Sequence, residues 1–198
     1  MDNIGYITGL VSNSMFNYPL CRYFFPDKER RRRLLPEVFN VMVKYGFRFG
    51  DIFISSDLIE GAAIVGPPGS KKFSNFTAAK CGGLLLPFKF GIPALDRINN
   101  YQTYAAKIHE KYAPDYSVHL MLLAVAPSMQ GKGYGSILIG KVLSECRRIK
   151  ASCYLETQSE NNAALYSHFG FNVIYKGLIP ETHMMNYAMV FSQYSSNR

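Results

Sequence analysis

Cysteine and histidine are sparse in this chain, and neither is spaced for a metal site. The 198 residues contain four histidines and four cysteines, and the cysteines never form C-x-x-C: Cys21, Cys81, Cys146 and Cys153. His109-Glu110 begins a zinc-protease motif, but the second histidine of H-E-x-x-H would fall on Ala113. We therefore expect no metal and no disulfide framework, with reduced thiols in a cytoplasmic protein.

Long apolar runs are also missing. No stretch approaches the roughly 18 apolar residues that a membrane-spanning helix needs. The first ten residues, MDNIGYITGL, include an acid at Asp2 and no basic lead into an apolar run, unlike a signal peptide. These absences predict a cytosolic chain with no membrane partner.

The formal charge of +8 is not organised for nucleic-acid binding. It fits a polyanionic ligand, but it also serves solubility. Its densest run, Arg30 to Arg33, follows Asp27, a residue type that commonly caps helices. Because successive helical residues lie about 100° apart, the run forms no single stripe, and Glu29 and Glu37 dilute it. We expect a solvated helix surface and no specific nucleic-acid partner.

Two familiar phosphate-binding patterns are incomplete. Gly131, Gly133 and Gly135 give G-x-G-x-G, which is not the dinucleotide pattern G-x-G-x-x-G, and no Lys-Ser/Thr pair follows them. The loop from 66 to 72 lacks P-loop spacing, and its two prolines remove amide donors.

A phosphate site is nevertheless indicated by the stretch from 120 to 143. It reads as an apolar strand, a turn rich in glycine, and an amphipathic helix. Glycines allow a ligand to approach the backbone, and the amides and dipole at a helix N-terminus favour an anion. The turn from Gln130 to Ser136 is therefore a candidate anion cradle.

The remaining patterns predict an α/β fold in one domain, residues 1–198. We expect helices first, with Pro36 opening or kinking a second helical segment at 38–45, then a β-hairpin at 51–56 and 60–65. A short helix at 76–81 and a long one at 94–112 follow, while 84–90 stays unassigned.

In the central strand, 116–125, alternation places His119, Met121, Leu123 and Val125 on one face, with Leu120, Leu122 and Ala124 on the other. A helix, a strand at 153–157, a helix at 162–169 and two final strands complete a mixed sheet.

Two linked motifs lie in the second half of the chain. Gln130-x-x-Gly133-x-Gly135 follows the central strand, and farther on come a short strand at 154–157, then Asn162, Tyr166 and Gly170-Phe171. This series resembles the GCN5-related N-acetyltransferase (GNAT) family over about 117–190, and is most similar to its antibiotic-acetylating members, the group of puromycin N-acetyltransferase. The resemblance implies a mostly antiparallel sheet flanked by helices, with an acetyl-CoA-binding core at about 115–190 and a variable acceptor side at about 1–114.

The resemblance also implies a cosubstrate, acetyl-CoA, and residues that bind it. Its pyrophosphate would lie on the cradle, and a backbone amide near Val125 would polarise the thioester carbonyl. Asn162 would contact the pantetheine arm, cap a helix, or do both. The implied cofactor-binding residues are Leu123, Ala124, Val125, Gln130, Gly131, Lys132, Gly133, Tyr134, Gly135, Ser136 and Asn162.

Three side chains are candidates for catalysis. Tyr166 is expected to protonate the leaving thiolate, since a phenol with pKa near 10 can donate to a developing thiolate; the alternative is a tyrosine packed in the core. For the base, His119 has a suitable ordinary pKa near 6.5, yet a lone histidine in an apolar strand is more often a packed residue. Glu156 is the rival, and a water chain could replace both.

The expected activity is direct acetyl transfer to a primary amine. A small-molecule acceptor is favoured because the segments expected to line its cleft, 84–94 and 112–119, are apolar and aromatic apart from Asp115. The alternatives are a non-catalytic acyl-CoA sensor or subunit of the same fold, and a nucleic-acid-binding protein. Either a monomer or a homodimer is compatible with the sequence.

Overall fold

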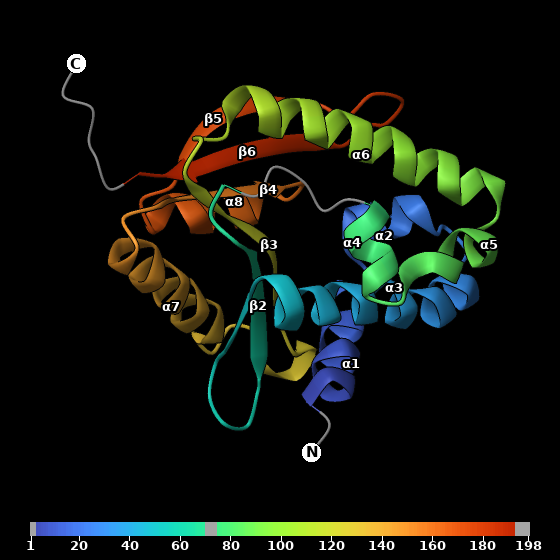
Figure 1. The fold of residues 1–198 in the computed structure, drawn as a ribbon, viewed down its shortest axis with the longest axis horizontal. Helices are drawn as coiled ribbons and strands as arrows, with labels where there is room; N and C mark the ends of the chain where they lie inside the picture. The colour runs from blue at the N-terminus through green and yellow to red at the C-terminus, as the bar shows by residue number, and fades with distance from the viewer. Residues whose placement is uncertain (1–2, 70–74, 193–198) are drawn as a thin grey trace.

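A six-stranded sheet separates two groups of helices (Figure 1). The computed structural model describes residues 3–69 and 75–192. The helices are α1 (Asn3–Met15), α2 (Pro19–Phe24), α3 (Lys28–Phe49), α4 (Asn75–Lys80), α5 (Leu86–Phe90), α6 (Ile92–Tyr112), α7 (Tyr134–Arg148) and α8 (Glu160–His168). Two 3-10 turns are η1 (Gly83–Leu85) and η2 (Pro127–Met129). The strands are β1 (Asp51–Ile54), β2 (Gly61–Gly66), β3 (Ser117–Val125), β4 (Ser152–Thr157), β5 (Asn172–Leu178) and β6 (Met185–Phe191).

The sheet is mostly antiparallel, with strand order β1-β2-β3-β4-β6-β5. Its one parallel pair among the described residues joins β3 to β4, and that pairing is short. It begins at Ser117 and Ser152 and ends at His119 and Tyr154, although β3 continues to Val125. Beyond His119 the two central strands therefore diverge, and the sheet opens between its two halves.

Separate apolar clusters fill the two sides of the sheet. On one side α7 presents Leu138, Ile139, Val142, Leu143 and Cys146 to the sheet, as their helical spacing predicts. On the other side α1 and α3 cover the half that contains β2, and α6 lies beside β5 and β6 (Figure 1).

Several predictions from the sequence are confirmed. Helices precede the first hairpin, which pairs β1 with β2, and α6 fills the long helix expected at 94–112. The segment left unassigned at 84–90 forms η1 and α5. The proposed surface loop at 66–72 lies partly outside the described residues.

The expectation that Pro36 opens a second helix is wrong, because α3 is one helix from Lys28 to Phe49 with Pro36 inside it. Proline removes one helical hydrogen bond, which usually bends or ends a helix. Here Leu34, Leu35 and Phe39 on both sides of Pro36 are buried in the core under α1. Burial of this face outweighs the local cost.

The simple alternation expected along β3 is also wrong. The register with β2 shifts between Ile64 and Val65, so that Ile64 faces Leu122 while Val65 faces Leu120, and Met121 is the extra residue. A bulge of this kind interrupts the two-residue repeat. Leu120 therefore packs on the α7 side and Leu122 on the α3 side.

The four arginines are not simply a solvated surface. Arg31 is buried, and its guanidinium donates to the carbonyl oxygens of Phe25 at 2.6 Å and Pro26 at 3.0 Å. Arg30 donates to the carbonyl oxygen of Phe90 at 2.5 Å. These two residues tie the start of α3 to the chain before it and to α5.

Candidate active site at the opening between β3 and β4

The glycine turn forms an open backbone surface at the start of α7. Gly131 has φ 76° and Gly133 has φ 89°, a conformation that favours glycine. A Cβ placed on Gly131, Gly133 or Gly135 would meet no described atom within 4 Å. Space therefore lies directly beside the amides of the turn.

The N-terminus of α7 also lacks a side-chain cap within the described residues. By contrast, Asp27 caps α3 and Ser159 caps α8, each accepting a hydrogen bond from a backbone amide. The first amides of an uncapped helix remain available to an anion. Gln130 lies beside this turn, and its side-chain amide donates to the carbonyl oxygen of Val125 at 3.2 Å.

The end of β3 presents backbone groups toward the opening. The amide of Ala126 donates to the carbonyl oxygen of Glu60 on the β2 side at 2.7 Å. Backbone groups alternate in direction along an antiparallel pair, so those of Leu123 and Val125 point away from β2. Ala124 directs its backbone to β2 instead. Of the three residues predicted to bind the cofactor here, Leu123 and Val125 have the suitable orientation.

A carboxylate in the β1–β2 turn braces the start of α7. Glu60 accepts hydrogen bonds from the hydroxyls of Ser55 at 2.8 Å and Ser56 at 2.7 Å, and these lower its pKa to about 2. A hydrogen bond with Glu60 raises the pKa of Tyr134. Lys141 donates to the carbonyl oxygens of Ile54 and Ser55. The glycine turn is therefore fixed to the hairpin, although Tyr134 was predicted only as a cofactor contact.

Tyr166 lies on α8, on the same side of the sheet as α7. The ring is buried and packs edge-on against Phe171 with centroids 5.5 Å apart. Burial raises the pKa of its hydroxyl, and the nearby Tyr18 and Cys153 raise it further. Within the described residues the hydroxyl makes no hydrogen bond, so it is free to donate to a ligand.

Asn162 does not cap α8. Ser159 is the cap, and its hydroxyl accepts the backbone amide of Asn162 at 3.3 Å. A serine one turn earlier takes the capping role because it stands directly before the helix. The half-buried side chain of Asn162 keeps the other predicted role, contact with a ligand.

Glu156 lies on the opposite face of β4, within a connected set of polar side chains. Its carboxylate accepts hydrogen bonds from the hydroxyl of Tyr154 at 2.9 Å and the side-chain amide of Asn186 at 2.7 Å. Burial raises the pKa of Glu156, against the lowering effect of these two bonds. We call this set the Glu156 network: Tyr18, Tyr101, Tyr154, Glu156, Gln158 and Asn186.

Gln158 links the Glu156 network to the N-terminal helices. Its side-chain amide donates to Asn186 at 2.6 Å and to the hydroxyl of Tyr101 at 3.4 Å. Tyr18 donates to the Gln158 side-chain oxygen at 3.1 Å and accepts the Gln158 backbone amide at 3.0 Å. The first residues of the chain thus reach the end of β4, close to Tyr166.

His119 lies apart from these hydrogen bonds, in an aromatic cluster. Its ring centroid is 5.1 Å from that of His109 and 5.2 Å from that of Tyr154. Burial lowers the pKa of His119 to about 3, with a smaller contribution from His109. The imidazole is therefore neutral at pH 7 and a weak proton acceptor.

Sequence reasoning predicted only Glu156 among the six members of the Glu156 network and missed the other five. Tyr18 belongs to no motif noted in the sequence, and it lies 140 residues before Gln158 in the chain. A tyrosine near a proline-broken aromatic run carries no signal of its role. Only the fold brings it to Gln158.

A comparison with known protein families matches one continuous part of the chain. Residues 103–171 match the model of the Acetyltransferase (GNAT) family, a span that contains β3, the glycine turn, α7, β4 and Tyr166. This match covers the segment that carries both motifs noted in the sequence. The matched GNAT segment ends at Phe171, so Asn186 and the N-terminal helices lie outside it.

One curated relative matches beyond the GNAT segment. It is an uncharacterized N-acetyltransferase of Schizosaccharomyces pombe, 25% identical over 167 residues. The match covers 80% of this chain and 66% of the relative, just under two thirds of its length. The printed name of this relative is that of an N-acetyltransferase, the class of enzyme that the two motifs resemble.

Solved structures share the fold over nearly the full chain. A protein from Corynebacterium glutamicum described as a histone acetyltransferase and related acetyltransferase has a TM-score of 0.69 at 19% identity, covering 99% of this chain and 94% of its own. The polyamine N-acetyltransferase of Drosophila melanogaster, which forms N-acetylagmatine, has a TM-score of 0.55 at 17% identity, covering 95% and 93%. The N-terminal helices therefore belong to the same fold as the GNAT segment.

The described residues hold neither a metal-binding cluster nor a membrane-crossing helix. Residues 3–69 and 75–192 contain no group of three or more histidine, cysteine, aspartate or glutamate side chains arranged for a metal. None of the helices in those ranges has the length and apolar content to cross a bilayer.

Proposed function

We propose that this chain transfers an acetyl group from acetyl-CoA directly to a primary amine of a small molecule. The observation that carries the proposal is the convergence at the opening between β3 and β4. The uncapped glycine turn, the outward backbone of Val125, Tyr166 and the Glu156 network surround it. One face supplies groups suited to a cofactor and the other supplies groups suited to an acceptor.

The glycine turn fits the pyrophosphate of coenzyme A. Open space beside Gly131, Gly133 and Gly135 leaves room for phosphate oxygens to approach the amides. Leu123 and Val125 would hold the pantetheine arm in the manner of an added strand, and Asn162 would contact it from α8. When bound, acetyl-CoA supplies an activated acetyl carbonyl and a thiolate leaving group.

The chain's own residues would manage charge and protons in a single displacement. The amine nitrogen forms a bond to the acetyl carbon while the carbon–sulfur bond breaks. The Val125 amide would stabilise the negative charge that develops on the carbonyl oxygen. The amine loses one proton to a base, and the sulfur gains one from Tyr166, so the products are an amide and a thiol.

Glu156 suits the role of base better than His119. The buried carboxylate has a raised pKa, which makes it a stronger proton acceptor than an exposed glutamate. The pKa of His119 is about 3, which leaves it little capacity to accept a proton. We expect Glu156→Gln to lower kcat/KM by about 10²-fold or more and to change its acid limb, while His119→Asn leaves that limb in place. The reverse result in pH–rate profiles would assign the base to His119.

A small amine acceptor fits the composition of the Glu156 network. It offers one carboxylate and several tyrosines, whereas a lysine-rich protein tail calls for multiple acids. The Drosophila melanogaster relative in fold acetylates a small amine. Kinship with the antibiotic-acetylating members is part of this proposal, and puromycin therefore belongs among the acceptors to be tested.

A panel of acceptors tests the function directly. Puromycin, arylalkylamines, agmatine, polyamines and basic peptides would be incubated with acetyl-CoA, and thiol release would be measured. We expect turnover with at least one small amine. Binding of acetyl-CoA without turnover on any amine would favour the sensor or subunit, and exclusive activity on basic peptides would overturn the small-molecule assignment.

A further inference from the structure

A short segment before α6 carries an exposed apolar tip. Leu84 is 68% exposed, Leu85 62%, Phe88 84% and Ile92 75%. Leu84, Leu85 and Phe88 lie on η1 and α5, and Ile92 begins α6 directly after Gly91, which ends α5 with φ 66°. We call these four residues the apolar tip. It contradicts the expectation that the whole of 84–94 lines a cleft, because these side chains face solvent.

The apolar tip is rigidly attached to the protein. Phe90 and Ala94 from the same stretch are buried in the core under α1 and α3. Phe90 packs edge-on against Phe25 at 5.3 Å, and Lys89 forms an ion pair with Glu37 at 2.6 Å. Figure 1 shows α5 at the margin of the molecule, away from β4. The tip therefore protrudes from a fixed base.

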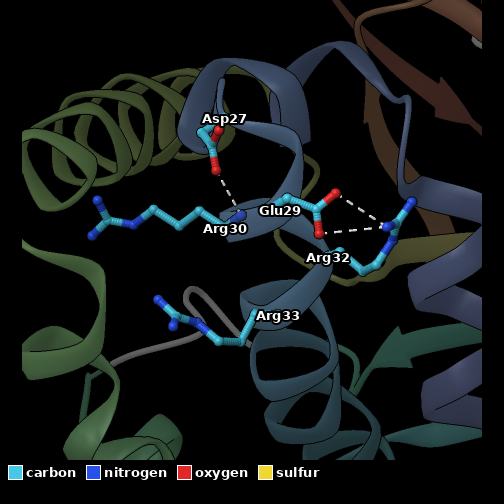
Figure 2. Close-up of a pocket in the computed structure, with 5 residues that line it drawn as sticks. All are labelled: Asp27, Glu29, Arg30, Arg32 and Arg33. Atoms are coloured by element: carbon cyan, nitrogen blue, oxygen red, sulfur yellow. Dashed lines mark hydrogen bonds and ion pairs between the residues drawn. The ribbon is translucent and has the colours of Figure 1, made fainter.

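Basic side chains flank the end of the tip near α3. Arg30 reaches the carbonyl oxygen of Phe90. Figure 2 shows Arg30 and Arg33 extending to the same side of α3, beside a hollow of about 540 Å³. The acids that also line this hollow are engaged, because Glu29 pairs with Arg32 and Asp27 caps the helix. Arg33 forms no ion pair within the described residues.

Basic side chains also flank the other end of the tip. The Lys44 ammonium lies 3.8 Å from the position of a Cβ on Gly82, directly before η1. Lys44, Arg48 and Lys80 line a second hollow of about 360 Å³ together with Phe47, which is 51% exposed. The acid nearest in sequence beyond the tip is Asp96, one turn after Ile92. Among the described residues that line the two hollows, Asp27 and Glu29 are the only acids, so basic side chains predominate beside the tip.

We infer that the apolar tip and its basic flanks form a docking surface for an anionic phospholipid membrane. Leucine, phenylalanine and isoleucine side chains that protrude this far can enter the boundary between headgroups and acyl chains. Arginine and lysine on both sides would meet lipid phosphates and carboxylates. A protein partner is less suited, because the apolar side chains project outward instead of lining a groove. The missing membrane-spanning run, which led to the expectation of no membrane partner, does not bear on surface binding.

Vesicle binding tests this inference without reference to acetyl transfer. The full chain would be mixed with vesicles of phosphatidylcholine alone or with about a third phosphatidylserine, and bound protein measured by sedimentation. We expect binding to the anionic vesicles that weakens with added salt. Leu85→Ser with Phe88→Ser should weaken it at least about tenfold, because apolar insertion is lost. Leu178→Ser, an exposed apolar residue on β5, is the matched control and should bind normally.

A charge variant separates the two components of the surface. Arg33→Gln with Lys44→Gln should reduce binding to anionic vesicles about tenfold while leaving any binding to phosphatidylcholine unchanged. Absence of wild-type binding to the anionic vesicles would overturn the inference, as would normal binding by the Leu85 and Phe88 variant. A concentration-dependent dimer that this variant abolishes, without vesicle binding, would identify a second copy of the chain as the occupant.

Discussion

The glycine turn and the Glu156 network lie on opposite sides of the same opening, but they are built differently. The turn offers backbone amides from consecutive residues, and its neighbours leave open space. The Glu156 network offers side chains from the residue before α2, from α6, from the end of β4 and the residue after it, and from β6, and these already bond to one another. A backbone site depends on a local conformation, whereas a side-chain site depends on the whole fold.

This difference suggests how each side can change in evolution and in the laboratory. The turn tolerates few substitutions, because a side chain would fill the space that a ligand needs. In the network, one altered residue leaves several partners without their hydrogen bonds. Substitutions on the two sides should therefore differ in kind, with loss of ligand binding at the turn and loss of stability or rate at the network.

The largest effect is expected at the turn. Gly133→Val should abolish the rise in melting temperature that coenzyme A produces, since a ligand stabilises the folded state that binds it and the new side chain would occupy the ligand's space. Gly82→Val is a matched control, because Gly82 has φ 90° against 89° for Gly133 and lies far from the turn in the sequence. The control carries similar backbone strain and should keep the shift. An undiminished shift in folded Gly133→Val protein would remove the turn from the binding site.

The next effect separates chemistry from packing on the α8 side. Tyr166→Phe keeps the ring that packs on Phe171 but removes the hydroxyl, so kcat should fall by about 10²–10⁴-fold, the usual contribution of general acid catalysis. Coenzyme A affinity should change little, because the hydroxyl gains its strong partner only as charge develops on sulfur. Turnover within about threefold of wild type, with chemistry limiting the rate, would show that another group or solvent is the acid.

The same contrast explains what could be predicted from the sequence. The strand, glycine turn and α7 follow from apolar spacing and glycine positions within one continuous stretch. The continuity of α3 through Pro36 could not be predicted from the sequence, because it depends on the burial of Leu34, Leu35 and Phe39 against α1. The shift at Met121 depends on the register with β2, which no single strand reveals.

The candidate site likewise contains residues that the sequence predicted and residues that it did not. Tyr166 and Glu156 were predicted because they occur in linked motifs, although their roles remain predictions. Tyr18 and Asn186 were missed because their importance arises from hydrogen bonds to residues distant in sequence. The sequence offered capping as one of two roles for Asn162, but Ser159, directly before the helix, caps α8.

A third experiment tests whether the N-terminal helices are tied to the network. Tyr18→Phe should lower the free energy of unfolding by about 1–3 kcal/mol, because the Gln158 amide and side-chain oxygen lose a partner in a half-buried position. Denaturant unfolding monitored by circular dichroism would measure this. Tyr23→Phe, in the same part of the chain, is the control with an expected change near zero. Equal stability of both variants would mean that the contact carries no net energy.

The smallest effect concerns the pH dependence of stability at His119, beside the Glu156 network. Its pKa is about 3 in the folded protein, because burial and then His109 disfavour the charged ring, against about 6.5 when unfolded. Below pH 6.5 the unfolded chain therefore gains a proton that the folded chain does not, and stability falls as the pH falls towards 3. Between pH 7 and about 5.5 this linkage costs about 1 kcal/mol, and His119→Asn should remove that part of the slope. Parallel stability curves for wild type and His119→Asn over this range would mean that His119 is accessible to protons in the folded state, and would restore it as a rival to Glu156 for the base.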